Sequence, residues 1–321
     1  MNKISFLGFI IFLSPNLLAQ QTGSTKTKLQ LAINKKALNF IAMGDWGRNG
    51  EYKQREVAGE MGIAAKSLHT DFFIATGDNF YPSGVASTTD YRWIASYENI
   101  YTAQSLQENW YVVLGNHDYK GNPQAEVDYT KIDRRWNMPA RYYSKKIAIN
   151  DDTTQLALFV YIDTTPLLTE YYKSTDHSEV KTQDTTQQRK WLENVLSDRS
   201  PNVKWKIVVG HHPLYTGGKR MDADETKELK NLLKPIFDKY KVDLYICGHE
   251  HSLQYIRPNG NTHYFISGAG SETTSTILHP DGGKYAISEN GFIAFSMSPK
   301  ILTAQFISYN GEVLYKTDIV K

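Results

Sequence analysis

Five short apolar runs in this chain each stop at a glycine that is followed by residues able to bind a metal ion. The five endings are Gly44-Asp45, Gly77-Asp78, Gly115-Asn116-His117-Asp118, Gly210-His211-His212 and Gly248-His249-Glu250-His251. In an open α/β sheet, ligands bind beyond the carboxyl ends of the strands, where glycine lets the backbone turn sharply and approach a ligand closely. A single such ending is usually only a turn or a helix N-cap. Because five independent coincidences are improbable, we expect the five ends to meet at one edge and to surround a metal site.

Apolar runs alternate with segments of helical spacing from residue 38 onward, which is typical of an α/β fold. The predicted strands are residues 40–43, 72–75, 110–114, 156–162, 205–209 and 244–247. The predicted helices are residues 57–68, 91–101, 187–196 and 225–240. From residue 263 onward, apolar and polar residues alternate around Asn290-Gly291 and Asn310-Gly311, which predicts antiparallel hairpins. We expect two packed β-sheets with helices outside them.

The N-terminus has the pattern of a secretory signal peptide. Lys3 precedes a short apolar run, residues 4–13, and Ala19 stands at a plausible cleavage point. The run is well short of the ~20 apolar residues that a membrane-spanning helix needs, and Pro15 interrupts it. We therefore expect residues 1–19 to be a cleaved leader, so that the protein is secreted or periplasmic and has no membrane anchor afterwards. Residues 20–36 are expected to form a flexible lead-in, and residues 37–321 a single domain.

The charge balance gives no argument for a polyanionic partner. The chain has 36 basic and 34 acidic residues and a formal net charge of +2, so neither nucleic acid nor an anionic membrane is expected to bind. Its single cysteine, Cys247, excludes an internal disulfide and lies in an apolar run, which favours a place in the core.

The residue types at the five endings suit a pair of hard metal ions. A carboxylate can bridge two cations, and oxygen and imidazole ligands suit zinc, iron or manganese. Two such ions ~3.5–4 Å apart can hold a phosphate, acidify a bound water and stabilise both oxygens of an in-line displacement. The sequence therefore predicts a hydrolase that cleaves a small phosphate ester, and we separately expect the protein to be a monomer.

The order of these motifs resembles that of the calcineurin-like metallophosphoesterases, and within them that of the purple acid phosphatases, especially the small tartrate-resistant type. The stretches that carry the resemblance are residues 44–47, 77–81, 248–255 and 267–270, and it extends from residue 38 to the C-terminus. It implies a four-layer αββα fold with helices on both sides of a two-sheet sandwich. It also implies a dinuclear acid phosphatase that hydrolyses phosphomonoesters by attack of a metal-bound hydroxide at acidic pH.

The resemblance implies a role for each matching residue. Fe(III) would be bound by four residues, Asp45, Asp78, Tyr81 and His251. Asp78 would bridge to a second ion, Fe(II), Zn or Mn, whose site is completed by Asn116, His211 and His249. A Tyr81 phenolate on Fe(III) absorbs visible light, which gives the family its purple colour.

The proton donor is less clearly defined by the resemblance. His117 matches the family histidine that contacts the substrate phosphate or the leaving group, and Asp118 is expected to orient it. Small family members often carry a further histidine several residues beyond the Gly-His-x-Pro motif, where this chain instead has Arg220. His212 stands where the small enzymes often have tyrosine. Substrate contact by His212 or Arg220 and a surface or packing role are equally open at this point.

Two further parts of the chain have a simpler expectation. The polar segment 168–186 matches the place of an exposed loop over the site in mammalian members, and a plain surface loop explains it equally well. The four remaining histidines follow no ligand pattern and are expected to be structural or solvent-facing: His69, His177, His263 and His279.

Position 47 separates this chain from other branches of the superfamily. Phosphodiesterases and nucleotidases usually have Asp-x-His in the first motif, whereas this chain has Gly47, so that Tyr81 can supply the missing ligand. Two alternatives remain: a phosphodiesterase or nucleotide-directed hydrolase on the same scaffold, and a non-catalytic secreted binding protein that retains the metal site.

Overall fold

The computed structural model describes Met1 and residues 31–321, so the expected leader 1–19 and most of the lead-in 20–36 lie outside the described residues. Two seven-stranded sheets form the centre of the molecule. The first has the order β14 (Val313–Val320), β13 (Ile301–Ser308), β12 (Gly291–Met297), β1 (Leu38–Met43), β2 (Phe72–Ala75), β3 (Asn109–Val112) and β4 (Trp136–Asn137). The second has the order β11 (Gly283–Ile287), β9 (Leu253–Ile256), β10 (His263–Ser267), β8 (Leu244–Cys247), β7 (Val203–Val209), β6 (Asp152–Tyr161) and β5 (Tyr143–Ile149).

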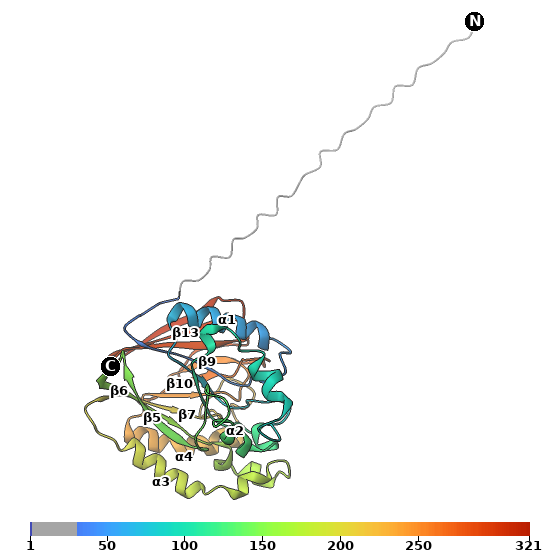
Figure 1. Cartoon of the computed structure of the whole chain (residues 1–321). Coiled ribbons are helices and arrows are strands. Elements are labelled where there is room, and N and C mark those ends of the chain that lie inside the picture. Colours follow the sequence, from blue (N-terminus) through green and yellow to red (C-terminus); the bar gives the residue numbers. More distant parts are fainter. Residues whose placement is uncertain (2–30) are drawn as a thin grey trace.

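Helices cover the outer faces of the two sheets, as the four-layer prediction requires. Helix α1 (Gln54–Leu68) lies on the first sheet, and α3 (Thr185–Leu196) and α4 (Asp224–Tyr240) lie on the second (Figure 1). Helix α2 (Pro123–Tyr129) and a π-helical turn (Trp93–Glu98) stand beside strand β4 of the first sheet, where the Trp136 indole N–H donates to the Glu126 carbonyl oxygen and the Trp136 ring packs against Trp93. Among the described residues, we find no helix whose length and apolar character would let it cross a membrane.

The inner faces of the sheets meet through aromatic side chains. Phe40 of β1 is fully buried and stacks on Phe72 and Phe295 of its own sheet, with ring centroids 5.2 and 4.9 Å away. The ring of Phe40 is also perpendicular to the ring of Phe159 in the second sheet, with the two ring centroids 5.3 Å apart. Such edge-to-face pairs add to the apolar area that the sheets bury against each other. This packing fixes how the ends of one sheet face the ends of the other.

One of the two predicted hairpin turns is wrong. Asn310-Gly311 does connect the antiparallel strands β13 and β14, with Gly311 at φ +84°. Asn290-Gly291 instead carries the chain from β11 in the second sheet to β12 in the first. Glycine is needed there because a Cβ at Gly291 would lie 2.0 Å from the carbonyl oxygen of Ile307 on β13. The glycine of this Asn-Gly pair is therefore required by its close contact with β13, and not by a hairpin turn.

The five strand ends do meet, although they belong to two sheets and not to one edge. β1, β2 and β3 run parallel in the first sheet, and β7 and β8 run parallel in the second. The loops after them face each other across the gap between the sheets. The His249 backbone N–H donates to Asp45 Oδ2 at 2.9 Å, and His211 Nδ1 lies 2.8 Å from the Thr76 carbonyl oxygen. Residues from the two sheets thereby share one site.

Candidate metal centre

The backbone at this site has an unusual conformation at three of the expected ligands. Asp45, Asp78 and His249 have positive φ angles of 58°, 49° and 69°. Such left-handed backbone costs a non-glycine residue on the order of 1–3 kcal/mol and persists only where the surroundings impose it. Gly115 shows how tight these surroundings are, because a Cβ there would lie 2.2 Å from Asp78 Oδ1. The loops are therefore built to hold particular side chains in place.

A first cluster of ligand atoms gathers around the Tyr81 hydroxyl. This oxygen lies 2.9 Å from Asp78 Oδ2, 3.1 Å from Asp45 Oδ1 and 3.1 Å from His251 Nε2. The two aspartates and Tyr81 are almost completely buried. Three oxygens and one imidazole nitrogen in this arrangement suit a hard cation. All four residues that were expected at the first ion are therefore brought together.

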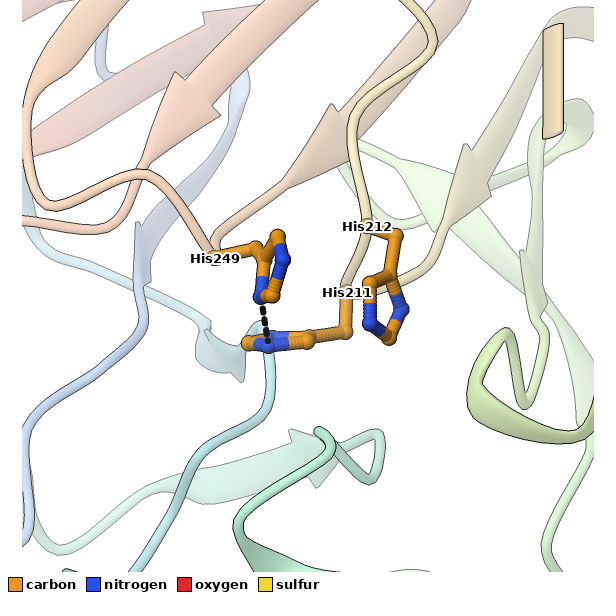
Figure 2. Close-up of side chains that lie close together, drawn as sticks. All are labelled: His211, His212 and His249. Atoms are coloured by element: carbon orange, nitrogen blue, oxygen red, sulfur yellow. Dashed lines mark hydrogen bonds between the residues drawn. The ribbon is translucent and has the colours of Figure 1, made fainter. Parts of the chain in front are cut away.

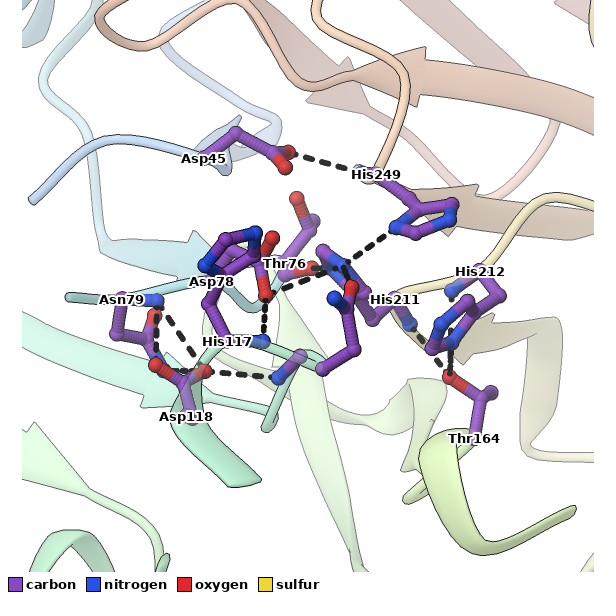
Figure 3. Close-up of polar contacts among 12 residues, drawn as sticks. Asp45, Thr76, Asp78, Asn79, His117, Asp118, Thr164, His211, His212 and His249 are labelled. Atoms are coloured by element: carbon purple, nitrogen blue, oxygen red, sulfur yellow. Dashed lines mark hydrogen bonds and ion pairs between the residues drawn. The ribbon is translucent and has the colours of Figure 1, made fainter. Parts of the chain in front are cut away.

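A second cluster gathers around His211 Nε2. This nitrogen lies 3.1 Å from His249 Nδ1, 3.3 Å from Asn116 Oδ1 and 3.4 Å from Asp78 Oδ1. Figure 2 shows the contact between the two imidazoles, and Figure 3 shows His211 and His117 meeting at Asp78. The four residues that were expected at the second ion also come together. Asp78 belongs to both clusters, with Oδ2 in the first and Oδ1 in the second.

The protonation of these groups follows from their burial and their neighbours. Burial and the charges of Asp45 and Asp78 raise the pKa of Tyr81 well above 10, so a cation must displace the phenol proton to bind there. Burial raises the pKa of Asp78, but the charge of His211 outweighs it and holds that pKa well below its usual range. Burial and the charges of Arg220 and His211 lower the pKa of His249, which leaves the neutral imidazole that metals bind. The donor set thus fits two adjacent metal ions.

His117 lies beside the clusters with one ring nitrogen already occupied. Its Nδ1 is 2.7 Å from the carbonyl oxygen of Pro82 and therefore carries a proton in this contact. Its backbone N–H donates to Asp78 Oδ1 at 2.7 Å, which ties the residue to the shared carboxylate. Burial lowers the pKa of His117, although Asp78 opposes this.

The prediction that Asp118 orients His117 is wrong. The Asp118 carboxylate accepts hydrogen bonds from the backbone N–H groups of Gly115, Asn79 and Phe80 at 2.8, 2.9 and 3.2 Å. The Pro82 carbonyl takes the orienting role instead. Asp118 has another use, because it fixes the loop that carries Asp78 to the loop that carries Asn116 (Figure 3). A carboxylate is suited to collect several N–H groups from two loops at once.

His212 is a buried support of the site and does not line its cavity. Its Nδ1 lies 2.8 Å from Thr164 Oγ1 and its Nε2 lies 2.9 Å from the Tyr171 hydroxyl, so both ring nitrogens have protein partners. It is close enough to His211 and His249 to form a three-histidine group with ligand atoms within 4.8 Å (Figure 2). Tyr171 belongs to the polar segment 168–186, which therefore packs against the site and is not a plain surface loop.

Arg220 does reach the cavity, and a carboxylate holds it there. Glu225 Oε1 lies 2.8 Å from Arg220 Nε and 3.3 Å from His249 Nε2, the nitrogen that faces away from the second cluster. Such a carboxylate orients an imidazole ligand and raises its basicity. The sequence offered no signal for Glu225, because acidic residues are ordinary in the first turn of a helix such as α4.

A cavity of about 180 Å³ opens over both clusters. Five of the expected ligands line it, Asp78, Tyr81, Asn116, His249 and His251, together with His117. Three cationic side chains stand at its wall, Arg48, Lys219 and Arg220. Their charge favours an anionic ligand at this position. Arg48 and Lys219 were not expected from the sequence, since neither belongs to a ligand motif.

A larger hollow of about 490 Å³ lies at the opposite ends of the strands of the second sheet. Its cations mainly satisfy protein groups. Lys206 Nζ donates to the carbonyl oxygens of Leu196 and Tyr240, the last residues of α3 and α4, and Lys321 pairs with Asp243 at 2.6 Å. The smaller cavity therefore remains the better candidate for the functional site.

Comparison with known proteins agrees with this geometry. The sequence pattern of the calcineurin-like phosphoesterase family matches residues 38–253. Purple acid phosphatase 7 of Arabidopsis thaliana is 34% identical over 92% of this chain and 90% of its own length. The human tartrate-resistant acid phosphatase type 5 is 32% identical over 88% of this chain and 90% of its own length.

Solved structures show the same fold. GAP50, the anchor in the inner membrane complex of Plasmodium, superimposes with a TM-score of 0.77 at 25% identity and covers 88% of this chain and 89% of its own. The purple acid phosphatase PPD1 from yellow lupin has a TM-score of 0.64 at 15% identity, over 88% of this chain and 54% of its own. At that identity the lupin structure supports the fold alone.

Replacing Asp78 should remove both metal ions at once. In Asp78→Ala the two oxygens that face the two clusters disappear together, so metal analysis of the purified variant should show that both ions are depleted. Asp45→Ala is the matched comparison, because Asp45 is an expected ligand of the first ion only and touches the second cluster just through the backbone N–H of His249, so it should deplete mainly one ion. Full retention of one ion by Asp78→Ala would contradict the shared position of this carboxylate.

Proposed function

This chain belongs to the calcineurin-like phosphoesterase family and, within it, to the purple acid phosphatases, and from this premise we propose that its site hydrolyses small phosphomonoesters with two adjacent metal ions. It is a metal-dependent acid phosphatase by this relationship. The observation that carries the dinuclear proposal is the position of Asp78, whose two carboxylate oxygens belong to different ligand clusters. When bound, a pair of ions supplies the charge that holds a phosphate and lowers the pKa of a bound water.

The nature of the first cluster supports Fe(III) as one of the two ions. Its donors are two carboxylates, one imidazole and the Tyr81 phenol, and a highly charged cation is the kind that can displace a phenol proton whose pKa is raised. The second cluster, with two imidazoles, an amide and the shared carboxylate, suits Fe(II), Zn or Mn. We propose this combination as the working cofactor.

The backbone at Gly47 supports this assignment over the phosphodiesterase alternative. A Cβ at Gly47 would lie 1.9 Å from the carbonyl oxygen of Asn79, so this position has no room for the histidine of the Asp-x-His motif. The Tyr81 hydroxyl, 3.1 Å from both Asp45 Oδ1 and His251 Nε2, is the group that would serve as the ligand instead. The close approach of the Gly47 and Asn79 backbones thus argues against a histidine ligand at position 47 and is compatible with a tyrosine ligand at position 81.

The side chains around the clusters would bind and protonate the substrate. Arg220 and Lys219 place positive charge at the cavity wall, where they attract the phosphate. Because the Nδ1 proton of His117 is held by Pro82, the other ring nitrogen is the one available to exchange a proton with the leaving group. Glu225 keeps Arg220 and His249 in place.

We also propose that the protein is exported and acts as a monomer made of one domain, residues 37–321. The signal-like pattern of residues 1–19 supports export, and completion of both ligand clusters by a single chain supports a monomer. N-terminal sequencing of the mature protein should begin near Gln20, and light scattering should give the mass of one chain. Recovery of protein with an intact Met1 from the cell exterior or periplasm would contradict export.

The substrate class is tested by a direct comparison of ester types. At acidic pH the metal-loaded protein should have a clearly higher kcat/KM for 4-nitrophenyl phosphate than for the corresponding diester, bis(4-nitrophenyl) phosphate. Asp78→Ala, measured in parallel, gives the background rate. Preference for the diester would favour the phosphodiesterase alternative, and bound metal without turnover of either ester would favour a non-catalytic protein.

His117→Ala should slow turnover by roughly 10²–10⁴-fold, the usual worth of a positioned proton-transfer group, while metal content stays unchanged. The loss should be smaller for nitrophenyl esters than for alkyl esters, because nitrophenolate leaves without protonation. Steady-state rates with both kinds of ester measure this difference. His279→Ala is the control, since it removes an imidazole outside the cavity. Equal slowing for good and poor leaving groups would exclude His117 as the acid.

A further inference from the structure

Arg48 lies against the candidate iron ligand Tyr81. Its guanidinium carbon is 3.7 Å from the centroid of the Tyr81 ring and 5.1 Å from the centroid of the Tyr52 ring. A cation within about 6 Å of an aromatic face is attracted to the ring electrons, and a phenolate ring attracts it more strongly because it carries a full negative charge. Arg48 directly follows Gly47 in the first ligand loop, so its place is set by the same strand end that positions Asp45.

Several contacts hold this guanidinium in one orientation. Its Nε donates to Ser271 Oγ at 3.2 Å, and its Nη2 lies 2.8 Å from Glu272 Oε2. Ser271 in turn donates to the backbone carbonyl of Asp45 at 2.7 Å, which links this group to the metal loop. Only 15% of the Arg48 side chain is exposed. A guanidinium fixed at two of its nitrogens and partly shielded from water exerts a steady local charge on its neighbours.

We propose that Arg48 is a positioning residue that stabilises the phenolate of Tyr81 and sets the colour and the reduction potential of the iron site. This inference rests on the proposed function, because it needs Fe(III) at the first cluster. A positive charge beside the phenolate lowers the energy of its electrons, so more energy is needed to move one toward iron and the visible band lies at shorter wavelength. The same charge favours the reduced metal, which carries one positive charge fewer, and so raises the potential.

Glu272 provides a way to separate charge from simple packing. Its carboxylate contacts Arg48 from the exposed side and partly offsets the positive charge. Removing the charge of Arg48 and removing the charge of Glu272 should therefore shift the visible band and the reduction potential of the iron site in opposite directions. If the substitutions acted only by loosening the packing, the band and the potential would instead shift in the same direction in both variants. The contacts of Arg48 with Ser271 and the two tyrosine rings do not involve Glu272, so they should persist when Glu272 is replaced.

The experiment compares four iron-loaded variants with the wild type by visible spectroscopy and by spectroelectrochemical titration. Arg48→Gln should shift the band to longer wavelength and lower the reduction potential. Glu272→Gln should shift the band to shorter wavelength and raise the potential. Arg48→Lys keeps the charge without the two-point attachment and should fall between Arg48→Gln and the wild type. Lys53→Gln removes a positive charge whose contacts are with Glu56 and Tyr309, and should leave both readings unchanged.

The outcomes distinguish this inference from the proposed function. A wild-type protein that binds Fe(III) without a visible band would overturn this inference and the assignment of Tyr81 as an iron ligand, whereas the proposed two-metal hydrolysis of phosphomonoesters would stand. A normal wild-type band that does not move in Arg48→Gln would overturn the role of Arg48 alone. Shifts of Arg48→Gln and Glu272→Gln in the same direction would also overturn it. If Arg48→Gln fails to retain iron, Glu272→Gln and Arg48→Lys still decide the sign of the effect.

Discussion

The shared carboxylate of Asp78 is the contact on which the rest of the site depends. Its two oxygens lie in two ligand clusters, and this requires three loops to approach one side chain closely. Gly115 leaves room for it, the His117 N–H and the Tyr81 hydroxyl donate to it, and a left-handed backbone turns it toward both clusters. Burying a carboxylate is costly unless opposite charge lies beside it, and cations at the two clusters would supply such charge on both sides of Asp78. The arrangement is therefore best understood as a frame for two cations.

Around this frame, a further layer of charged groups sets the properties of the ligands. Glu225 holds His249 and Arg220, and Asp118 ties together the loops of Asp78 and Asn116. At the first cluster, Arg48 lies over the ring of Tyr81 and is itself paired with Glu272. Each of these groups touches a ligand or its loop and does not itself belong to either cluster. In the proposed metal site they would determine how basic and how rigid the ligands are.

Much of the architecture could be predicted because the buried strands are recognisable as short apolar runs, and each ligand motif directly follows one of them. The residues that gather in the two clusters could be picked out from the sequence, since each stands directly after a strand end or a few residues beyond it. Two errors show what local patterns do not contain. Asn290-Gly291 looked like a hairpin turn because the sequence does not reveal that Gly291 packs against β13, and Asp118 looked like a partner of His117 because adjacency in sequence hides where the side chain points. Glu225 and Tyr171 were missed because their roles arise only when distant segments meet.

The central claim is that two ions share Asp78, and anomalous X-ray scattering from crystals of the active, metal-loaded protein tests it most directly. Data collected on both sides of the absorption edge of each metal locate every ion and identify its element. Two peaks ~3.5–4 Å apart, one on either side of Asp78, are predicted, with iron on the side of Tyr81. A single peak, or a second ion that Asp78 does not contact, would contradict the dinuclear site.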